Sequence, residues 1–326
     1  MILDGNDAAA VSRAAQALAA GELVGLPTET VYGLGARADD DAAVARIFAA
    51  KGRPSEHPLI VHVAEAADAA RFAASVPSVA QRLMAAFWPG PLTVIVPRAL
   101  GVAAAAAGGQ DSIGLRCPSH PVAQALLRAA RELGVNGVAA PSANRFGRIS
   151  PTRAIHVAQE FGDGLLVLDG GDCALGIESA VVDCTRGHPV LLRPGVLTRQ
   201  RIEAAAGEPL REPDMHSPRA SGTLEAHYAP RARVRLMAGP MLHAALQVLG
   251  PSALKLAVYS RTVGLPAGSA LQRRVMPAQA DRAAHELFSI LRELDATGVD
   301  LIWVEAPPPE PEWDGVRDRL ERASAA

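Results

Sequence analysis

The sequence predicts an α/β protein with one large mixed sheet in its first two thirds and a small βαβ-type domain after it. Three observations carry this prediction: helical and extended patterns alternate at first, a segment rich in proline and charge follows, and the alternation then resumes. The chain has 326 residues, which is long for a single core, and 49% of them are hydrophobic. We therefore expect folded domains at residues 1–200 and 231–326, joined by a linker at 201–230.

Helices of the first domain are predicted from apolar spacing and from residues typical of helix ends. Residues 8–20 are alanine-rich and stop at Gly21, a residue common after a helix. A second helix begins at the acidic run 39–41, which favours the helix dipole, and ends near Gly52. Further helices are expected at 77–87, 119–132 and 152–161.

Strands are predicted where short apolar runs lie between turn residues. In the first domain these runs are 23–26, 59–63, 92–96, 112–116, 137–140, 165–168, 179–184 and 189–192. In the second domain the expected strands are 234–237, 254–259 and 301–305, and the expected helices are 239–249 and 281–295. Strands separated by helices predict a parallel sheet there.

Composition excludes several classes of protein. A net charge of −2 excludes a whole-chain basic nucleic-acid binder. The chain has three cysteines, Cys117, Cys173 and Cys184, and no CxxC spacing. We therefore expect neither a disulfide scaffold nor a zinc ribbon. The N-terminus has no signal-peptide pattern, and no apolar run could span a membrane. We expect a cytoplasmic protein with no membrane partner.

Residues 27–35, PTETVYGLG, follow the first predicted strand with hydroxyl and glycine residues. Their hydroxyls and backbone amides could face a ligand at the carboxyl end of that strand. A β-turn with internally bonded threonines explains the segment equally well, so both interpretations stay open.

A cluster of cations follows the second predicted helix. Lys51 and Arg53 lie at the helix end, and His57 and His62 flank the next strand. Fixed positive charge of this kind suits a triphosphate, although complementation of the helix dipole would also place cations here. Of the 32 basic residues only Lys51 and Lys255 are lysines, and this rarity favours a functional role for Lys51.

Three further segments interrupt the apolar pattern. Arg116 ends a predicted strand, where its guanidinium can fork onto a carboxylate, and we expect Cys117 beside it to be a packed residue. Residues 140–152 form a turn-rich loop whose following helix could hold an anion, or simply an Asn and Ser turn with a helix cap. The glycine-rich stretch 169–179 leads towards Arg193.

Common catalytic motifs are absent from the sequence. There is no GxxxxGK[ST] loop, no GxGxxG after a strand, no GxSxG elbow and no zinc-deaminase pattern. His285 and Glu286 begin like HExxH, but Ser289 stands where the second histidine would be. We therefore predict no metal site made by the protein itself.

The interrupted segments form a series of motifs along the chain. In order, they are PTETVYGLG, KGRP with PLIVHV, WPGPLTVIV, GLRCPSHP, APSANRFGRISPT, DGG with GIES, RPG and HYAP. Together they resemble the threonylcarbamoyl-AMP synthases built on the YrdC domain. The resemblance covers residues 8 to about 230, and the domain that follows marks the long, two-domain form of the family. It implies a YrdC-like first domain, while the strand and helix pattern predicts a Rossmann-like βαβ second domain.

The resemblance implies a nucleotidyltransferase that joins L-threonine, bicarbonate or carbon dioxide, and ATP into threonylcarbamoyl-AMP and releases pyrophosphate. Mg²⁺ is expected to accompany ATP. The product would serve tRNA processing, being passed to a tRNA threonylcarbamoyl transferase machinery that modifies the position next to the anticodon. Whether the protein itself binds tRNA stably is left open.

The resemblance also implies roles for individual residues. Those expected to bind threonine are Thr30, His62, Arg116, the backbone of Ala140, and Ser179. Those expected to bind ATP are Lys51, Arg53, His57, Ser112, Ser142, Asn144, Ser150, Arg193 and Tyr228. Lys51, Arg53 and Arg116 are the expected catalytic residues, and His227 and Tyr228 are expected to form a lid over the nucleotide.

Two positions depart from the family pattern. The family commonly has Asn where this chain has His57, and Pro-Gly where it has Ser221 and Gly222.

Two other functions compete with this interpretation. An RNA-binding module of the same fold without catalysis is the alternative, disfavoured by the near-neutral charge and few aromatics. The carbamoyltransferase of hydrogenase maturation needs an acylphosphatase domain and zinc-finger cysteines, which three scattered cysteines cannot supply.

Overall fold

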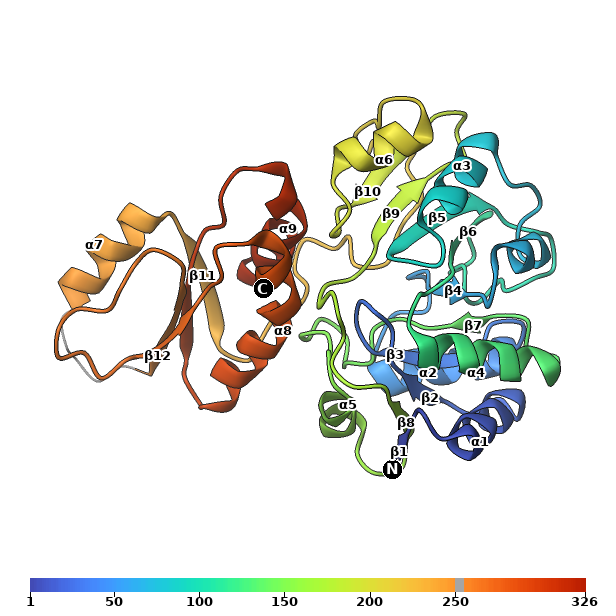
Figure 1. Ribbon diagram of the computed structural model, residues 1–326, viewed down its shortest axis with the longest axis horizontal. Helices are drawn as coiled ribbons and strands as arrows, with labels where there is room; N and C mark the ends of the chain where they lie inside the picture. The colour runs from blue at the N-terminus through green and yellow to red at the C-terminus, as the bar shows by residue number, and fades with distance from the viewer. Residues whose placement is uncertain (250–254) are drawn as a thin grey trace. The chain divides into compact units, whose positions relative to one another are not determined.

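The computed structural model describes residues 1–249 and 255–326, and the chain divides into two compact units (Figure 1). The first unit comprises residues 1–146 and 150–223, and the second comprises residues 147–149 and 224–326. Each unit is built around a sheet of its own. Among the helices within the described ranges, none has both the length and the apolar character that crossing a membrane requires.

The first unit contains a ten-stranded sheet in the order β1-β8-β2-β3-β7-β4-β6-β5-β9-β10. Its strands are β1 (Ile2–Asp4), β2 (Val24–Leu26), β3 (Gly33–Arg37), β4 (Ile60–His62), β5 (Leu92–Pro97), β6 (Ser112–Arg116), β7 (Val138–Ala139), β8 (Leu166–Asp169), β9 (Ala180–Asp183) and β10 (Val190–Arg193). Strand β6 runs parallel to β4 but antiparallel to β5. The predicted large mixed sheet is therefore confirmed.

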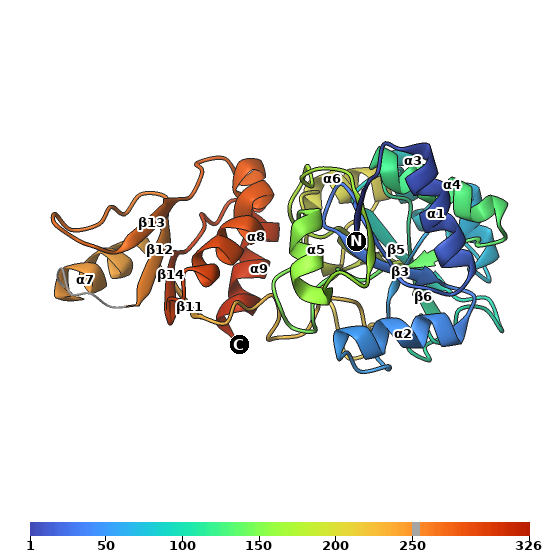
Figure 2. The same cartoon turned by 90° about the horizontal axis from the view of Figure 1, so that it is seen from below.

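Helices cover both faces of this sheet, with α1 and α4 on one side and α2 on the other (Figure 2). The helices of the first unit are α1 (Ala8–Ala19), α2 (Asp41–Lys51), α3 (Ser78–Phe87), α4 (Pro121–Glu132), α5 (Ala154–Phe161) and α6 (Arg199–Ala206), with a 3-10 helix η1 (Ala66–Arg71). Helix α2 begins where Asp40 accepts hydrogen bonds from the Ala42 and Ala43 amides, and it ends at Gly52 in the left-handed conformation. The end signals read from the sequence thus hold.

Four elements of the first unit were not predicted, one of them the 3-10 helix η1. The edge strand β1 is another, and β3 is a third, because the second half of PTETVYGLG forms a strand and not a loop. A Cβ on Gly35 would lie 2.8 Å from the Leu26 side chain, so the close pairing of β2 with β3 requires glycine there. Helix α6 lies where the sequence pattern decays, because it buries only Ile202 and Ala206.

The second unit contains a four-stranded parallel sheet in the order β11-β14-β12-β13. Its strands are β11 (Arg233–Met237), β12 (Leu256–Ser260), β13 (Gln272–Val275) and β14 (Leu301–Glu305), and its helices are α7 (Gly239–Leu249), α8 (Ala280–Ala296), α9 (Asp314–Ser324) and a 3-10 turn η2 (Pro311–Trp313). The predicted parallel sheet is confirmed, whereas β13 and α9 were not predicted. Leu254, the first residue of the strand expected at 254–259, lies outside the described residues.

Candidate active site

Three residues expected to bind threonine lie at the carboxyl ends of strands. His62 ends β4 and Arg116 ends β6, and the two parallel strands pair these residues with each other. Thr30 follows the end of β2 in the loop before β3. Because parallel strands end at the same edge of a sheet, the topology alone brings His62 and Arg116 together.

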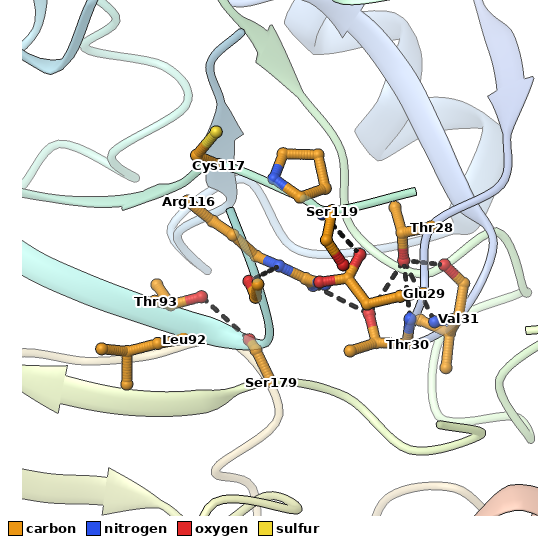
Figure 3. A network of polar contacts seen from close by, with 12 residues as sticks. Thr28, Glu29, Thr30, Val31, Leu92, Thr93, Arg116, Cys117, Ser119 and Ser179 are labelled. Atoms are coloured by element: carbon orange, nitrogen blue, oxygen red, sulfur yellow. Dashed lines mark hydrogen bonds and ion pairs between the residues drawn. The ribbon is translucent and has the colours of Figure 1, made fainter. Parts of the chain in front are cut away.

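Arg116 is the centre of a buried polar network (Figure 3). Its Nη1 donates to the Thr30 hydroxyl at 2.8 Å, its Nη2 lies 2.8 Å from a carboxylate oxygen of Glu29, and its Nε donates to the Gly90 carbonyl at 3.3 Å. A guanidinium has five N–H groups, and these contacts engage three of them. Within the described residues, Arg116 therefore retains donors for a further acceptor.

Glu29 is the partner of Arg116 that the sequence did not single out. Its carboxylate is buried, and its second oxygen accepts a hydrogen bond from the Ser119 amide at 3.1 Å. Burial alone would raise the pKa of Glu29, but the adjacent Arg116 guanidinium and backbone amides outweigh it and hold the pKa below its ordinary value. Glu29 and Arg116 thus form a charged, buried ion pair.

The threonines before β3 form a turn with internal hydrogen bonds. The Thr28 hydroxyl accepts from the Thr30 and Val31 amides at 3.2 Å and donates to the Val31 carbonyl at 2.6 Å. Its oxygen lies 2.8 Å from that of Thr30, whose hydroxyl also accepts from Arg116. The segment is therefore an internally bonded turn that presents one hydroxyl to the site.

His62 is 3% exposed and lies beside the Arg116 guanidinium. Burial, together with the charge of Arg116, lowers the pKa of His62 to about 3. The imidazole is consequently neutral near pH 7, and within the described residues its Nδ1 has no hydrogen-bond partner. A neutral imidazole can donate or accept one hydrogen bond without adding charge.

Ser179 and Arg193, expected to serve different substrates, contact each other directly. Arg193 donates to the Ser179 carbonyl from Nε at 3.1 Å and from Nη2 at 2.9 Å. The Ser179 hydroxyl lies 2.8 Å from that of Thr93 on β5. A Cβ on Gly195 would lie 2.5 Å from the Ala180 nitrogen, so glycine is required after Arg193 for this approach.

The loop after β7 is fastened to the sheet and to the end of α2. The Ala140 amide donates to the Ile60 carbonyl at 3.0 Å, so a substrate contact through this backbone would use the carbonyl oxygen. Lys51 donates from Nζ to the carbonyls of Ser142 and Asn144, each at 2.5 Å. Three of the residues expected to bind ATP, Lys51, Ser142 and Asn144, are thereby brought together.

Lys51 is fully enclosed at the last position of α2. Burial lowers the pKa of Lys51 well below its usual range, and the charge of Arg53 lowers it further, while Glu160 and Glu178 oppose this. An anion arriving at Lys51 would raise its pKa again. The ammonium is therefore placed to respond to a phosphate group.

Arg53 and His57 meet at an aromatic ring that the sequence analysis did not assign. The Arg53 guanidinium carbon lies 5.7 Å from the centroid of the Phe146 ring, and the His57 ring lies 5.5 Å from it in an edge-to-face arrangement. Arg53 also donates to the Pro58 carbonyl at 3.1 Å. Burial, and next the charge of Arg53, lower the pKa of His57. Phe146 thus links the two residues.

Ser150 lies at the far end of the same loop as Asn144. Its hydroxyl donates to the Glu178 carboxylate, and both side chains are buried. Glu178 directly precedes Ser179, one of the residues expected to bind the substrate L-threonine. A buried hydroxyl bonded to a carboxylate is held in one orientation.

Ser112 faces part of the chain that was expected to be linker. Ser112, Arg219 and Ser221 are among the residues lining a small cavity of about 10 Å³, room for about one water molecule. Gln110 exchanges two hydrogen bonds with the Arg219 backbone, at 2.8 and 3.1 Å, and Arg193 donates to the Ser221 carbonyl at 2.7 Å. Residues 219–221 are therefore fastened to Gln110 and Arg193 within the first unit.

Tyr228 belongs to the second unit, where its ring is packed. The ring centroid lies 5.4 Å from that of Phe288 and 5.4 Å from the Arg319 guanidinium, and His227 stacks edge-on against it at 4.1 Å. Tyr228 has a φ of +63°, an uncommon conformation for a residue with a side chain. Its role as a nucleotide residue stays a prediction.

The three cysteines lie in the packed interior of the protein. Cys117, Cys173 and Cys184 are free and buried. Burial raises the pKa of the Cys117 thiol, and its sulfur lies 3.4 Å from the Ala64 carbonyl, as a packed residue does. In the described ranges, no group of three or more His, Cys, Asp or Glu side chains is placed to hold a metal ion.

The arrangement divides into two neighbouring groups with different chemistry. The threonine group, comprising Glu29, Thr30, His62, Arg116 and Ser179, offers a buried guanidinium, a neutral imidazole and hydroxyls, which suit a small hydroxylated amino acid. The nucleotide group, comprising Lys51, Arg53, His57, Ser142, Asn144, Phe146 and Ser150, offers fixed cations and hydroxyls, which suit a polyphosphate. Glu29 and Phe146 lie within quoted motifs, yet no spacing rule distinguishes them from structural residues.

Two family models match consecutive parts of the chain. A family model covering Sua5, YciO and YrdC, described as "Telomere recombination", matches residues 16–195. A second model, described as "Threonylcarbamoyl-AMP synthase, C-terminal domain", matches residues 197–325. The two matches meet near the end of the first unit's last strand, β10.

Individual relatives are similar over nearly their whole length. A threonylcarbamoyl-AMP synthase from Pyrococcus abyssi is 39% identical over 312 residues, covering 93% of this chain and 91% of the relative. One from Bacillus subtilis is 36% identical over 326 residues, covering 96% and 92%. A crystal structure of Pyrococcus abyssi Sua5 complexed with L-threonine superposes with a TM-score of 0.91 at 35% identity, covering 99% of this chain and 97% of that one.

Proposed function

The chain belongs to the threonylcarbamoyl-AMP synthase family, and on this premise we propose that it makes threonylcarbamoyl-AMP from L-threonine, bicarbonate or carbon dioxide, and ATP. The observation that carries the proposal is the buried Arg116 guanidinium, with a hydroxyl, a carboxylate and a neutral imidazole around it. Such a group can hold the carboxylate of an amino acid in a fixed orientation. The known activity of relatives names that amino acid as threonine.

The reaction requires two bond-forming steps. The threonine amine attacks the carbon of carbon dioxide and loses a proton, which gives a carbamate. A carbamate oxygen then attacks the α-phosphorus of ATP, the bond to the β-phosphate oxygen breaks, and pyrophosphate leaves. No covalent intermediate with the protein is needed, so the protein contributes positioning and charge neutralisation.

The threonine group would orient the amino acid. Arg116 pairs with its carboxylate through the donors that Glu29 and Thr30 do not use. His62, being neutral, accepts or donates a hydrogen bond near the amine without repelling it. Ser179 and the Ala140 carbonyl would complete the contacts to threonine.

The nucleotide group would hold the triphosphate. Lys51 uses two of its three N–H groups on the Ser142 and Asn144 carbonyls, so the third can meet a phosphate oxygen. Further donors to the phosphates would come from Arg53, His57, Ser112 and Arg193. Ser150 would bind a phosphate oxygen once its hydroxyl turns away from Glu178. Negative charge moves to the leaving pyrophosphate, where Lys51 and Arg53 stabilise it.

Mg²⁺ enters this proposal with the nucleotide. Phosphate oxygens are the ligands that Mg²⁺ prefers, and it would neutralise part of the triphosphate charge when bound. In the part of the chain that the structure describes, no set of side chains forms a separate cation site. We expect the ion to be held by the phosphate oxygens of ATP.

Two later steps complete the proposal. His227 and Tyr228 would cover the nucleotide and limit hydrolysis of the labile product. The product would pass to a tRNA threonylcarbamoyl transferase, which uses it to modify tRNA next to the anticodon.

The test is formation of pyrophosphate by the purified protein with ATP, Mg²⁺, bicarbonate and L-threonine. We expect release that depends on every component, together with a product whose mass matches threonylcarbamoyl-AMP. Pyrophosphate release that continues without threonine would contradict the proposal, as would a failure to form that product.

A further inference from the structure

A three-residue segment of the nucleotide-binding loop belongs to the second unit. Residues 140–152, here called the nucleotide loop, carry Asn144 and Ser150, which the proposed function assigns to ATP. The first unit contains both of these residues, but residues 147–149 between them cluster with residues 224–326. The ends of the loop and its middle are thus held by different parts of the protein.

The backbone of the segment pairs with the HYAP motif. The Ala229 amide donates to the Gly147 carbonyl at 2.9 Å, and Arg148 and Ala229 form a parallel β-bridge. Gly147 has a φ of +77°, which a residue with a side chain rarely adopts, so the loop turns here at a glycine.

Helix α8 holds the same segment by two side chains. Arg292 donates from Nη2 to the Ile149 carbonyl, one residue before Ser150. Asp295 lies 3.5 Å from the Arg148 guanidinium and also accepts from the Ala232 amide at 2.8 Å. Residues three apart lie on the same face of a helix, so one face of α8 provides both contacts.

The HYAP motif is itself fixed within the second unit. Tyr228 packs against Phe288 of α8 and Arg319 of α9, and the His227 amide donates to the Arg322 carbonyl at 3.1 Å. The segment that pairs with Arg148 is therefore anchored by two helices.

We propose that Arg292 and Asp295 are positioning residues for ATP, and that the second domain contributes to the proposed reaction by fixing the middle of the nucleotide loop. The inference rests on the proposed function. A loop held at its centre has fewer conformations to lose when a ligand binds, so ATP meets Asn144 and Ser150 already oriented. The second domain thereby acts on nucleotide affinity through residues 147–149.

The chain offers a matched control on the same helix. Glu293, next to Arg292, pairs with Arg274 of β13, and both side chains are largely exposed. Arg274→Gln removes an arginine ion pair from α8 without touching the nucleotide loop. Arg292→Gln and Asp295→Asn remove the two contacts of interest.

The experiment measures binding of a non-hydrolysable ATP analogue with Mg²⁺, and of L-threonine alone, by calorimetry on the full-length variants. We expect Arg292→Gln and Asp295→Asn to weaken the ATP analogue by about three- to tenfold. Threonine affinity should stay unchanged, and Arg274→Gln should match the unmodified protein for both ligands. Amide exchange across 144–150 should become faster in the two α8 variants only.

Equal ATP-analogue affinity in all variants would overturn the inference, and so would parallel losses for ATP and threonine, which indicate general destabilisation. If the α8 variants fail to fold, Arg148→Gln tests the same contact from the loop and is expected to reproduce the selective loss. If the unmodified protein makes threonylcarbamoyl-AMP and only this pattern is missing, the inference alone fails. If it neither binds the analogue nor makes product, the proposed function fails and the inference falls with it.

Discussion

The threonine group and the nucleotide group are built in different ways. His62 and Arg116 are the last residues of neighbouring parallel strands, and the two shortest contacts of Arg116 are to the buried side chains of Thr30 and Glu29. The nucleotide residues lie on a helix end and a loop, and several of their donors are bonded to main-chain carbonyls. One group is fixed by the register of the sheet, and the other depends on a loop that is fastened at several points.

The difference has a consequence for substitutions. A change in the threonine group disturbs a buried ion pair and should affect folding as well as ligand binding. A change in the nucleotide group should act mainly on ATP and on turnover, because Lys51 and Arg53 are bonded to neutral main-chain carbonyls and not to a buried carboxylate. The following predictions test this separation from the largest expected effect to the smallest.

Glu29→Ala should give the largest loss of stability. It leaves the Arg116 guanidinium buried without its carboxylate, and removing one partner of a buried ion pair costs about 3–5 kcal/mol. Urea unfolding followed by circular dichroism measures the change in the free energy of unfolding.

The matched control is Glu65→Ala, which removes a glutamate whose ion pair with Arg131 is exposed. Exposed pairs contribute about 0–1 kcal/mol, so this variant should unfold almost like the unmodified protein. Similar losses for the two variants would show that the threonine group is not specially dependent on its buried pair.

Lys51→Met should lower turnover by roughly a hundredfold at saturating ATP while leaving threonine binding near normal. Methionine keeps an apolar stem in the enclosed site but removes the ammonium that would stabilise the departing pyrophosphate. Initial rates of pyrophosphate release give kcat, and calorimetry gives the threonine affinity. A normal kcat at saturating ATP would show that Lys51 does not stabilise the transition state. The proposed difference between the threonine group and the nucleotide group would then lose support.

The sequence could predict most of the sheet because its strands are short apolar runs between turn residues. Strands β5, β6 and β12 and helices α2, α7 and α8 lie where such patterns place them. Helix α6 has only two buried apolar residues, so its periodicity is too weak to detect. The sequence pattern did not predict strand β3, because the glycines that allow its close pairing with β2 are also typical of loops.

Motif resemblance gave the site residues, but their partners depend on three-dimensional contacts. Glu29 and Arg116 are far apart in sequence, and only the meeting of strand ends makes them an ion pair. The same holds for Phe146 between Arg53 and His57. No pattern in the chain indicates that residues 147–149 belong to a unit that begins again at 224.

Arg116→Lys should weaken threonine by about 1.5–3 kcal/mol and leave ATP affinity unchanged. Lysine retains the charge but cannot form two parallel hydrogen bonds with a carboxylate, nor reach Thr30 and Glu29 at once. Titration calorimetry with each ligand separately measures the two affinities. Equal losses for ATP and threonine would refute the assignment of Arg116 to the threonine carboxylate.

The smallest expected effect is a pH dependence of stability that arises from His62. Its pKa is about 3 in the folded protein but ordinarily about 6.5, so between these values the unfolded chain binds a proton that the folded chain does not. Stability therefore falls as the pH falls through this window, by about 1.4 kcal/mol per pH unit from this group. His62→Gln should remove that contribution, so its unfolding free energy should decline about 1 kcal/mol less between pH 6 and pH 5. Urea unfolding at both pH values measures the difference, with His216→Gln at an exposed histidine as the control. An unchanged pH slope in His62→Gln would mean that the imidazole can take up a proton in the folded state, and the threonine group would then be more open to solvent than its burial indicates.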